Sequence, residues 1–394
     1  MPQVNQAFIT PEVVVWARQR ARTTKDRLAK RLHTKPERVT SWEKGDSKPT
    51  FQQAEKLAEA LSIPLGYLFL PSPPQETIPL PDFRRASGKP ADSPSADLIS
   101  VLNDVIFKQE IYKNLLMKAG QTALPFVAKF SNRNTPDEVA GDIRSALAID
   151  QELRAKSKNW EEFFAAIVKK AESIGILVMK SGVAAGNPHR PLSVSEFRGF
   201  TISDPIAPVV FINGKDSAAA QIFTLAHELA HIWIGASGIS NESLKEQNAQ
   251  DEPVEKFCNA VAAEVLVPAK DLSAIWNTSK SIEENAQLVA QTFRVSGLVA
   301  IRRAFDTARI TWEDYIKSYQ LQEQKFKSRE AKKKAGGNFF SNILVRNSAS
   351  LTKTVVNAAL EGRVLYRDAA YMLNVSVPSI QKIADHLAKQ RSRK

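Results

Sequence analysis

The 394-residue chain contains one cysteine, which excludes an internal disulfide. It also lacks any apolar run near the length of about 18 residues that a membrane-spanning helix needs, and its first residues lack the pattern of a secretory signal. We therefore expect a cytoplasmic protein with no membrane partner. The composition, 43% hydrophobic and 24% charged, is typical of soluble globular domains, and the length predicts two or three of them.

Acidic residues are too few to balance the basic ones. The formal net charge is +12, and residues 1–70 hold 12 Lys and Arg against 7 Asp and Glu. Such a surplus in a compact segment is typical of proteins that contact nucleic acid, although it also aids solubility or attracts acidic proteins.

Histidine is scarce as well, with five in the chain, yet two of them fall four residues apart in a His227-Glu228-Leu-Ala-His231 motif. Side chains four apart lie on one face of a helix about one turn from each other, so both imidazoles can bind one metal ion. The carboxylate of Glu228 then projects toward water on that ion. This spacing predicts a hydrolytic metal site.

The ends and the apolar face of this stretch predict its helix independently. Asp216 or Ser217 can cap its start, and Gly235 offers a stop. Apolar residues recur at helical spacing and form a stripe away from the two histidines, made of Ile222, Leu225, Leu229 and Ile232. The core face and the ligand face are therefore separate.

A catalytic zinc site takes three protein ligands, so the two histidines need a third. The stretch from Pro253 to Pro268 is typical of a helix, and Glu255 and Asn259 share one of its faces. A carboxylate at 255 would complete the ligand set, and the amide at 259 could orient an imidazole. Glu264 on the same helix stays the alternative ligand, although its apolar neighbours favour a paired residue at the edge of the core.

These two segments resemble the signature of the ImmA/IrrE family of metallopeptidases, which looks like a His-Glu-x-x-His helix followed by Glu-x-x-x-Asn/Asp-x-x-Ala-Ala-x-x-Leu-x-Pro. The likeness extends upstream through 197–200 and 204–213, which look like the family's strands. It departs at Cys258 and Val261, where the family more often has Ala and Phe. Neither departure falls on a ligand.

The resemblance implies a small α+β zincin-like peptidase core with His227, His231 and Glu255 as metal ligands. Glu228 is then the general base, which takes a proton from water and passes it to the leaving amine. Zn²⁺ is the expected ion, and Mn²⁺ stays open because two imidazoles and one carboxylate accept it too. An extended substrate would add to the edge strand beside this helix, and residues 209–212 are predicted to be that edge.

Residues 1–70 have the pattern of a small all-α domain with helices predicted at 13–21, 25–32, 36–44, 51–61 and 65–69. The segment resembles the Cro/cI-type (XRE) helix-turn-helix, whose third helix enters the major groove. Lys25 stands where that family commonly has Gln. The resemblance implies DNA contacts from Lys25, Lys35, Arg38, Thr40, Ser41 and Lys44. A head that only docks a partner protein is the alternative.

The rest of the chain divides by composition. Residues 71–95 are Pro-rich and predict an extended linker. Residues 96–270 predict the peptidase domain, helical to about Glu172 and with its first strand at 175–179. Residues 271–320 predict a helical segment similar to a helix-turn-helix, and 321–394 a basic helical C-terminal region whose tail from Lys389 is disordered.

A short pattern recurs in three of these segments. Ala29-x-x-Leu32-x-Thr34 in the head matches the spacing at 290–296 and at 370–376, where a helix meets a turn and a second helix begins. The pattern also describes any pair of packed helices, so it predicts three helix-turn-helix-like units without assigning DNA contact to the second and third.

The sequence thus predicts a multidomain, mainly α protein that acts as a zinc-dependent endopeptidase on a specific regulatory protein, a transcriptional repressor, and carries a sequence-specific DNA-binding head. One alternative is an XRE-type regulator whose peptidase fold is structural or sensory. Another is an antitoxin-like protein that binds a partner. The presence of Glu228 favours the enzyme, because a structural zinc site needs no general base.

Overall fold

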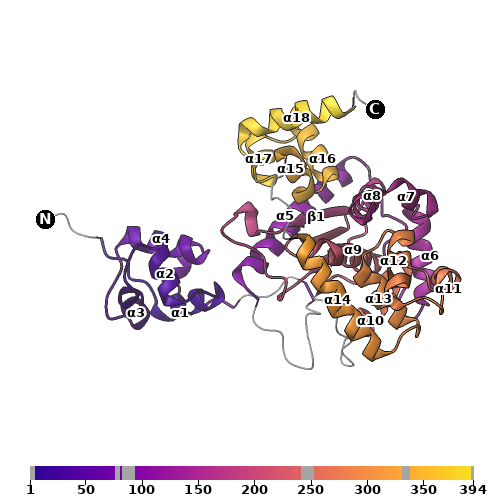
Figure 1. Cartoon of the computed structure of the whole chain (residues 1–394). Helices are drawn as coiled ribbons and strands as arrows, with labels where there is room; N and C mark the ends of the chain where they lie inside the picture. The colour runs from indigo at the N-terminus through magenta and orange to yellow at the C-terminus, as the bar shows by residue number, and fades with distance from the viewer. Residues whose placement is uncertain (1–4, 76–79, 82–93, 241–252, 331–337, 392–394) are drawn as a thin grey trace. The chain divides into compact units, whose positions relative to one another are not determined.

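The computed structural model describes residues 5–75, 80–81, 94–240, 253–330 and 338–391. It is 61% helical, with 18 α-helices and one four-stranded sheet among the described residues (Figure 1). The chain divides into two compact units, one formed by 1–79 and 91–103 and the other by 80–90 and 104–394. The predicted mainly α, multidomain fold is confirmed. Each described helix is too short or too polar to span a bilayer.

The first unit is an all-helical head with α1 (Pro11–Arg20), α2 (Lys25–Arg31), α3 (Pro36–Lys44), α4 (Phe51–Leu61) and the short 3-10 helix η1 (Leu65–Phe69). Thr24 caps α2 by accepting the Arg27 N–H at 3.2 Å, and Thr50 forms a capping box with Gln53 at the start of α4. Gly45 ends α3 in the left-handed region with φ 79°. These local signals explain why the observed bounds lie within two residues of the predicted ones.

The second unit contains a sheet with strand order β1-β3-β2-β4. β1 (Leu177–Ser181) pairs parallel with β3 (Val209–Asn213), and β2 (Gly199–Ile202) pairs antiparallel with β3 and with β4 (Gly238–Ser240). The prediction that 209–212 forms the edge was wrong, because β3 has a bonded neighbour on each side. All five of its residues are buried, as an inner strand requires. The first strand begins at Leu177 rather than at 175.

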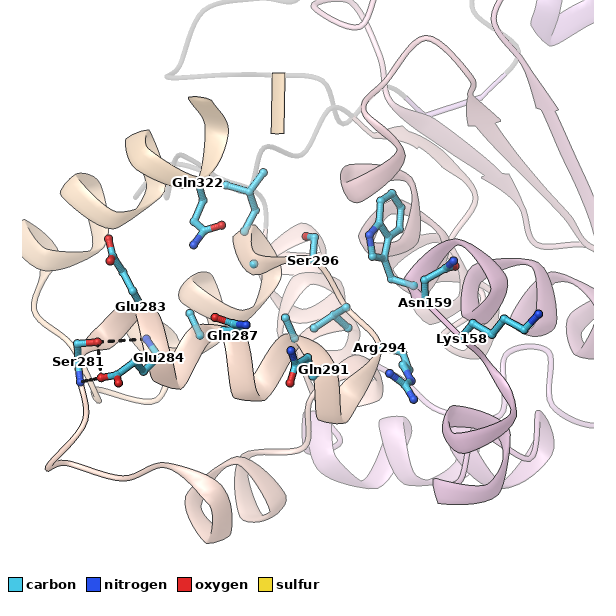
Figure 2. Close-up of a pocket in the computed structure, with 16 residues that line it drawn as sticks. Lys158, Asn159, Ser281, Glu283, Glu284, Gln287, Gln291, Arg294, Ser296 and Gln322 are labelled. Carbon is cyan, nitrogen blue, oxygen red and sulfur yellow. Dashed lines mark hydrogen bonds between the residues drawn. The ribbon is translucent and has the colours of Figure 1, made fainter. Parts of the chain in front are cut away.

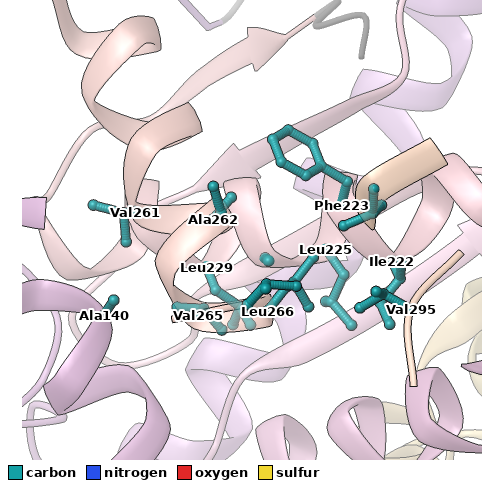
Figure 3. Packing of buried hydrophobic residues seen from close by; sticks show 14 of the residues in the cluster. Ala140, Ile222, Phe223, Leu225, Leu229, Val261, Ala262, Val265, Leu266 and Val295 are labelled. Carbon is teal, nitrogen blue, oxygen red and sulfur yellow. The ribbon is translucent and has the colours of Figure 1, made fainter. Parts of the chain in front are cut away.

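Helix α9 (Ala218–Trp233) packs on β2 and β3 and on α10 (Pro253–Leu266). The Ser217 hydroxyl caps α9 by accepting the Ala220 N–H at 3.2 Å, and Gly235 follows its end with φ 72°. Apolar side chains of both helices fill the space between them (Figure 3), among them Leu225, Leu229, Val265 and Leu266. Burial of one such side chain stabilises a fold by about 1.5–3 kcal/mol, so this packing fixes α9 against α10.

Further helices precede and follow these elements. The helical run predicted up to about Glu172 is confirmed as α5 (Ala96–Lys118), α6 (Pro136–Ala146), α7 (Gln151–Lys156) and α8 (Trp160–Ser173). After α10 come α11 (Ala269–Ile275), α12 (Ile282–Phe293), α13 (Gly297–Asp306) and α14 (Trp312–Glu330). Helix α6 contacts both α9 and α10, which adds a second layer behind the motif helices.

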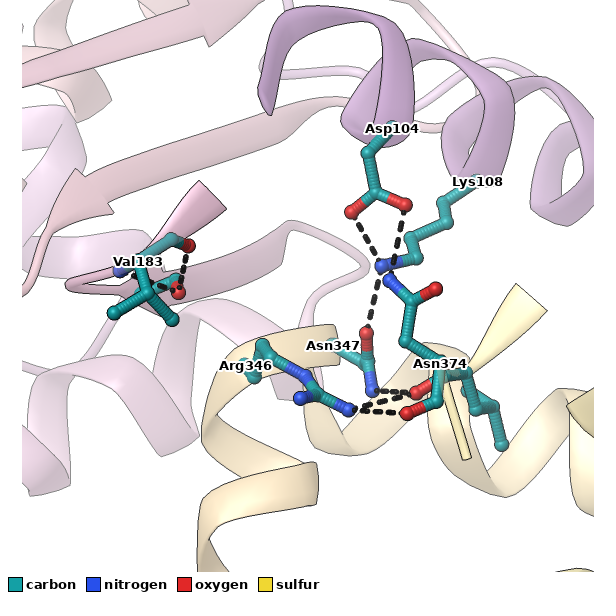
Figure 4. Close-up of polar contacts among 8 residues, drawn as sticks. Asp104, Lys108, Val183, Arg346, Asn347 and Asn374 are labelled. Carbon is teal, nitrogen blue, oxygen red and sulfur yellow. Dashed lines mark hydrogen bonds and ion pairs between the residues drawn. The ribbon is translucent and has the colours of Figure 1, made fainter. Parts of the chain in front are cut away.

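The chain ends in α15 (Phe339–Asn347), α16 (Ala349–Leu360), α17 (Tyr366–Met372) and α18 (Val377–Arg391). Lys108 of α5 donates to Asp104 at 2.6 Å and to Asn347 at 2.9 Å (Figure 4), and burial lowers the pKa of Lys108. Glu172 of α8 accepts the Ser348 hydroxyl at 2.5 Å and the Ala349 N–H at 2.8 Å. These contacts hold the last helices against α5 and α8 within the second unit.

Two predicted connecting segments fall partly outside the described residues. Residues 76–79 and 82–93 of the predicted linker lie outside them, as do residues 331–337 of the basic run. The prediction of a disordered tail was wrong for 389–391, which belong to α18. The predicted division into five segments stays a prediction.

Candidate metal centre

The paired helices α9 and α10 bring the three predicted ligands together. His227 and His231 project from α9 one turn apart, and Glu255 projects from the first turn of α10. One donor atom from each lies within 4.8 Å of the others. All three side chains are only 1% exposed. The sequence pattern could place the histidines on one face, and the packing of α10 against α9 supplies the carboxylate.

The distances suit a single small cation. The two Nε2 atoms lie 3.0 Å apart, and the Glu255 oxygens lie 3.1 Å from His227 Nε2 and 3.2 Å from His231 Nε2. Ligand atoms about 2.0–2.1 Å from a tetrahedral zinc ion are about 3.3 Å from each other. The three donors therefore have nearly the separation that one face of a zinc tetrahedron requires.

Asn259 settles which nitrogen of His227 is available for a metal. Its side-chain carbonyl oxygen lies 2.9 Å from His227 Nδ1, and since a carbonyl oxygen can only accept, Nδ1 carries the proton. The neutral ring then has a lone pair on Nε2, and this lone pair faces a Glu255 oxygen at 3.1 Å. Two acceptors opposed in a buried place repel unless a cation lies between them.

Glu228 lies beside these donors and is completely buried. Thr201 of β2 donates its hydroxyl to Glu228 Oε2 at 2.6 Å, while Oε1 has no hydrogen-bond partner among the described residues. A Cβ atom at Gly199 would lie 2.7 Å from that Oε1, so only glycine lets β2 approach so closely. The carboxylate is held by one oxygen, and the other is left for chemistry.

Burial and the facing imidazoles act in opposite directions on the two carboxyl groups. For Glu255, burial opposes ionisation, but positive charge on the imidazoles of His227 and His231 outweighs it and lowers the pKa to about 2. With His227 in the neutral tautomer that Asn259 favours, a bound cation has to supply that positive charge. For Glu228, burial is the larger effect and raises the pKa, against the imidazoles and the Thr201 hydrogen bond. Two carboxyl groups with pKa values pushed apart suit one anionic ligand and one proton acceptor.

The alternative ligand, Glu264, belongs to a different contact. It is paired with Arg303 of α13, and its Oε2 accepts the Ala269 N–H at 3.1 Å. The expectation that Glu264 is a paired residue at the edge of the core is confirmed. Its carboxylate therefore ties α10 to α11 and α13.

The roles of Thr201 and Gly199 were not predicted from the sequence. A strand was expected at 197–200, whereas β2 spans Gly199–Ile202. A polar residue inside an otherwise apolar strand was the available signal, because Thr201 follows Phe200 and precedes Ile202 in β2. Thr201 is fully buried, and its hydroxyl also lies 3.1 Å from the Glu228 carbonyl oxygen. Burying a hydroxyl without a partner is costly, so its partner had to be close by.

The outer edge of β2 is already paired. β4 lies on the outer side of β2, and the Ile239 N–H of β4 donates to the Pro81 carbonyl at 3.0 Å.

A separate cavity of about 600 Å³ opens between α12, α13, α14 and the start of α8 (Figure 2). Its lining contains none of His227, Glu228, His231 and Glu255. The chemistry of the motif therefore does not belong to that cavity.

The residues predicted to contact DNA fall into two groups in the head. Lys35, Arg38 and Lys44, at the start of α3 and along it, are exposed, whereas Lys25, Thr40 and Ser41 are partly buried. In the second group, Lys25 lies 3.1 Å from Glu43, the Thr40 hydroxyl donates to the Pro36 carbonyl at 3.1 Å, and the Ser41 hydroxyl donates to Ser47 at 2.7 Å. The exposed basic residues are better placed for a duplex.

Family models match three parts of the chain. Residues 171–305 match the model of the IrrE N-terminal-like domain of peptidase family M78, and this range contains the motif and Glu255. Residues 15–68 match a helix-turn-helix model, and 347–386 match a domain of unknown function. No curated protein and no solved structure matches the chain.

Proposed function

Since the chain carries an XRE-type helix-turn-helix domain and an IrrE-like domain of a metallopeptidase family, we propose that it is a metal-dependent endopeptidase. Its substrate is a specific regulatory protein, a transcriptional repressor, and its head binds DNA sequence-specifically. One observation carries the proposal. Three buried donor atoms, 3.0–3.2 Å apart, converge beside a buried carboxylate, one oxygen of which accepts no hydrogen bond from the residues that the structure describes.

The proposed roles follow from these contacts. His227, His231 and Glu255 hold the ion, which is Zn²⁺ or Mn²⁺, and Asn259 keeps the His227 ring in the tautomer whose Nε2 can bind it. The ion, when bound, supplies a Lewis acid for water and the scissile carbonyl. Glu228 Oε1 accepts the proton of the attacking water and passes it to the leaving amine.

Thr201 positions this base. Its hydroxyl holds Oε2 of Glu228 at 2.6 Å, so the carboxylate keeps one rotamer and presents Oε1. The surrounding residues exclude water, because Glu228 is fully buried and the ligands are 1% exposed. Exclusion of water strengthens each electrostatic contact inside the site.

The substrate class is an extended polypeptide segment. Sheet edges recognise such segments by backbone hydrogen bonds, and β2, which touches Glu228 through Thr201, is covered on its outer side by β4. The N–H of Ile239 in β4 is occupied by Pro81. Local opening at β4 therefore has to precede entry of a substrate, which fits a protease that acts selectively.

The direct test mixes the purified protein with candidate repressors encoded near its gene, under added Zn²⁺ and Mn²⁺. Glu228→Gln keeps the shape of the side chain and removes its basicity, so it should bind metal and leave the repressor intact. Glu264→Gln is the matched control and should cut like the wild type. Equal cutting by wild type and Glu228→Gln would contradict the mechanism.

The two other classes of function predict different results. A regulator with a structural metal would bind operator DNA and cut nothing, with Glu228→Gln indistinguishable from wild type in every assay. An antitoxin-like docking protein would not bind DNA with a steep salt dependence in gel shifts. Such a dependence arises when a protein neutralises DNA phosphates and releases their counterions. Glu228 Oε1, which has no hydrogen-bond partner within the described part of the chain, favours the enzyme, since a buried acceptor without a hydrogen bond costs about 1–3 kcal/mol and stabilises nothing.

A further inference from the structure

The helix pair α17–α18 repeats the turn of the N-terminal head. In the head, His33 has φ 51° and the Thr34 N–H donates to the Ala29 carbonyl at 2.9 Å. At the C-terminus Asn374 has φ 51°, and the Val375 N–H donates to the Ala370 carbonyl at 3.0 Å. The left-handed residue and the bond across it thus fall at equivalent positions in both pairs.

The packing positions of the two pairs are equivalent as well. Leu28, Val39 and Trp42 of α2 and α3 are buried, and so are Ala369, Ile380 and Ile383 at the same spacing in α17 and α18. Buried apolar residues at these positions pack the two helices of each pair against each other. The C-terminal pair therefore has the geometry of a helix-turn-helix rather than of any two packed helices.

A third pair in the chain shows that this turn alone does not suffice. Between α12 and α13, Arg294 has φ 56° and the Val295 N–H donates to the Ala290 carbonyl at 3.2 Å. However, six of the ten residues of α13 are buried, and Arg303 is paired with Glu264. That second helix is part of the core, so it cannot enter a groove of DNA.

In contrast, α18 presents an open face. Its exposed residues lie on the side away from Ile380 and Ile383, and they are Val377, Pro378, Gln381, Lys382, Asp385, Ala388 and Lys389. Tyr366 and Arg367 at the start of α17 are exposed too. Gln381 and Lys382 occupy the positions that Thr40 and Ser41 hold in α3, and unlike those partly buried residues they are exposed.

Charge distinguishes the same region. Residues 338–394 contain nine Lys and Arg against three Asp and Glu, a surplus of six, while the head has a surplus of five. The whole chain has a net charge of +12, so residues 71–337 contribute a surplus of one. The positive charge is concentrated in the head and in residues 338–394, and each of these segments contains its own exposed helix-turn-helix. Binding of duplex DNA requires such a basic segment.

We propose that α17 and α18 form a second unit that binds duplex DNA, with α18 in the major groove and with Arg367 and Lys382 at phosphates. This extends beyond the peptidase and the N-terminal head, and it gives a role to a region matched by a domain of unknown function. Arg346 fixes the turn by donating to the Leu373 carbonyl at 2.9 Å and the Asn374 carbonyl at 3.0 Å (Figure 4). The DNA-binding helix is thereby attached to the unit that holds the metal ligands.

The test uses the full-length protein and a fluorescent random-sequence duplex, with anisotropy measured at several salt concentrations. The background variant carries Lys35→Ala, Arg38→Ala and Lys44→Ala, which disables the head. We expect it to keep salt-dependent duplex binding. Adding Arg367→Ala and Lys382→Ala should weaken that binding at least tenfold and reduce the log–log salt slope by about 2, since each phosphate contact contributes about 0.9.

Lys118→Ala with Lys169→Ala is the matched control, because it removes the same charge from exposed positions of α5 and α8 and should leave the slope unchanged. The substituted side chains are exposed, so circular dichroism should show no loss of helix. No duplex binding in the background variant, or equal weakening by the control, would overturn the proposal. So would unchanged duplex binding after Arg367→Ala and Lys382→Ala, the result expected of a protein-docking surface. If the head itself does not bind DNA, the background variant will bind the duplex as tightly as wild type does. The Arg367→Ala and Lys382→Ala substitutions then still test whether α17 and α18 bind it.

Discussion

Replacement of Thr201 by valine isolates the contact that positions the proposed base. Valine has almost the shape of threonine, so the change deletes one hydroxyl from β2 without opening a cavity. The lost hydrogen bond joins Thr201 Oγ1 to Glu228 Oε2 at 2.6 Å in a fully buried place. A hydrogen bond to a charged group contributes about 1.5–3 kcal/mol, which corresponds to about a 10-fold to 150-fold fall in rate.

The assay is steady-state cleavage of the repressor by metal-loaded protein. We expect kcat to fall by that factor with metal content unchanged, because Thr201 contacts Glu228 and none of the three ligands. KM should stay nearly the same, because valine keeps the backbone of β2 along which a substrate would pair. Thr201→Ser should recover most of the loss, since it keeps the hydroxyl. Thr352→Val removes another buried hydroxyl, which donates to the Ser348 carbonyl at 2.8 Å in α16, and should leave kcat unchanged. Full activity in Thr201→Val, or an equal loss in Thr352→Val, would refute the role.

Three further predictions concern the surroundings of the site. Asn259→Leu should weaken metal affinity about 10-fold to 100-fold in a competition titration, because the His227 ring loses its orienting partner. Leu229→Ala, at a fully buried position, should lower the free energy of unfolding by about 2–5 kcal/mol in urea denaturation. Burial opposes ionisation of Asp204, but hydrogen bonds from Lys113 and two backbone N–H groups lower its pKa. A lowered pKa stabilises the fold above the unfolded value of about 3.9, so the stability advantage over Asp204→Asn should shrink as pH falls from about 5 through the lowered pKa.

Local signals explain what could be predicted from the sequence. The caps at Thr24, Thr50 and Ser217 and the left-handed Gly45 define helix ends without help from the rest of the fold, and those helices have nearly the expected bounds. The spacing of His227 and His231 also depends only on the period of one helix. These features are encoded within a few residues, so a single sequence reveals them.

Long-range pairing explains what could not be predicted. β3 is an inner strand because β1 and β2 flank it. The residues 209–213 do not by themselves specify which strands pair with them. The covering strand β4 is three residues long and follows the motif helix, too short for an alternation pattern. The contact of Thr201 with Glu228 joins residues 27 positions apart, so only the fold brings them together.

The central claim is that one divalent ion is held jointly by α9 and α10, through His227, His231 and Glu255. Its most direct test is the metal content of dialysed, purified protein by inductively coupled plasma mass spectrometry, for wild type, Glu255→Ala and Glu264→Ala. We predict one ion per chain in wild type and in Glu264→Ala, and almost none in Glu255→Ala. Retention of the ion by Glu255→Ala, with its loss from Glu264→Ala, would contradict the account.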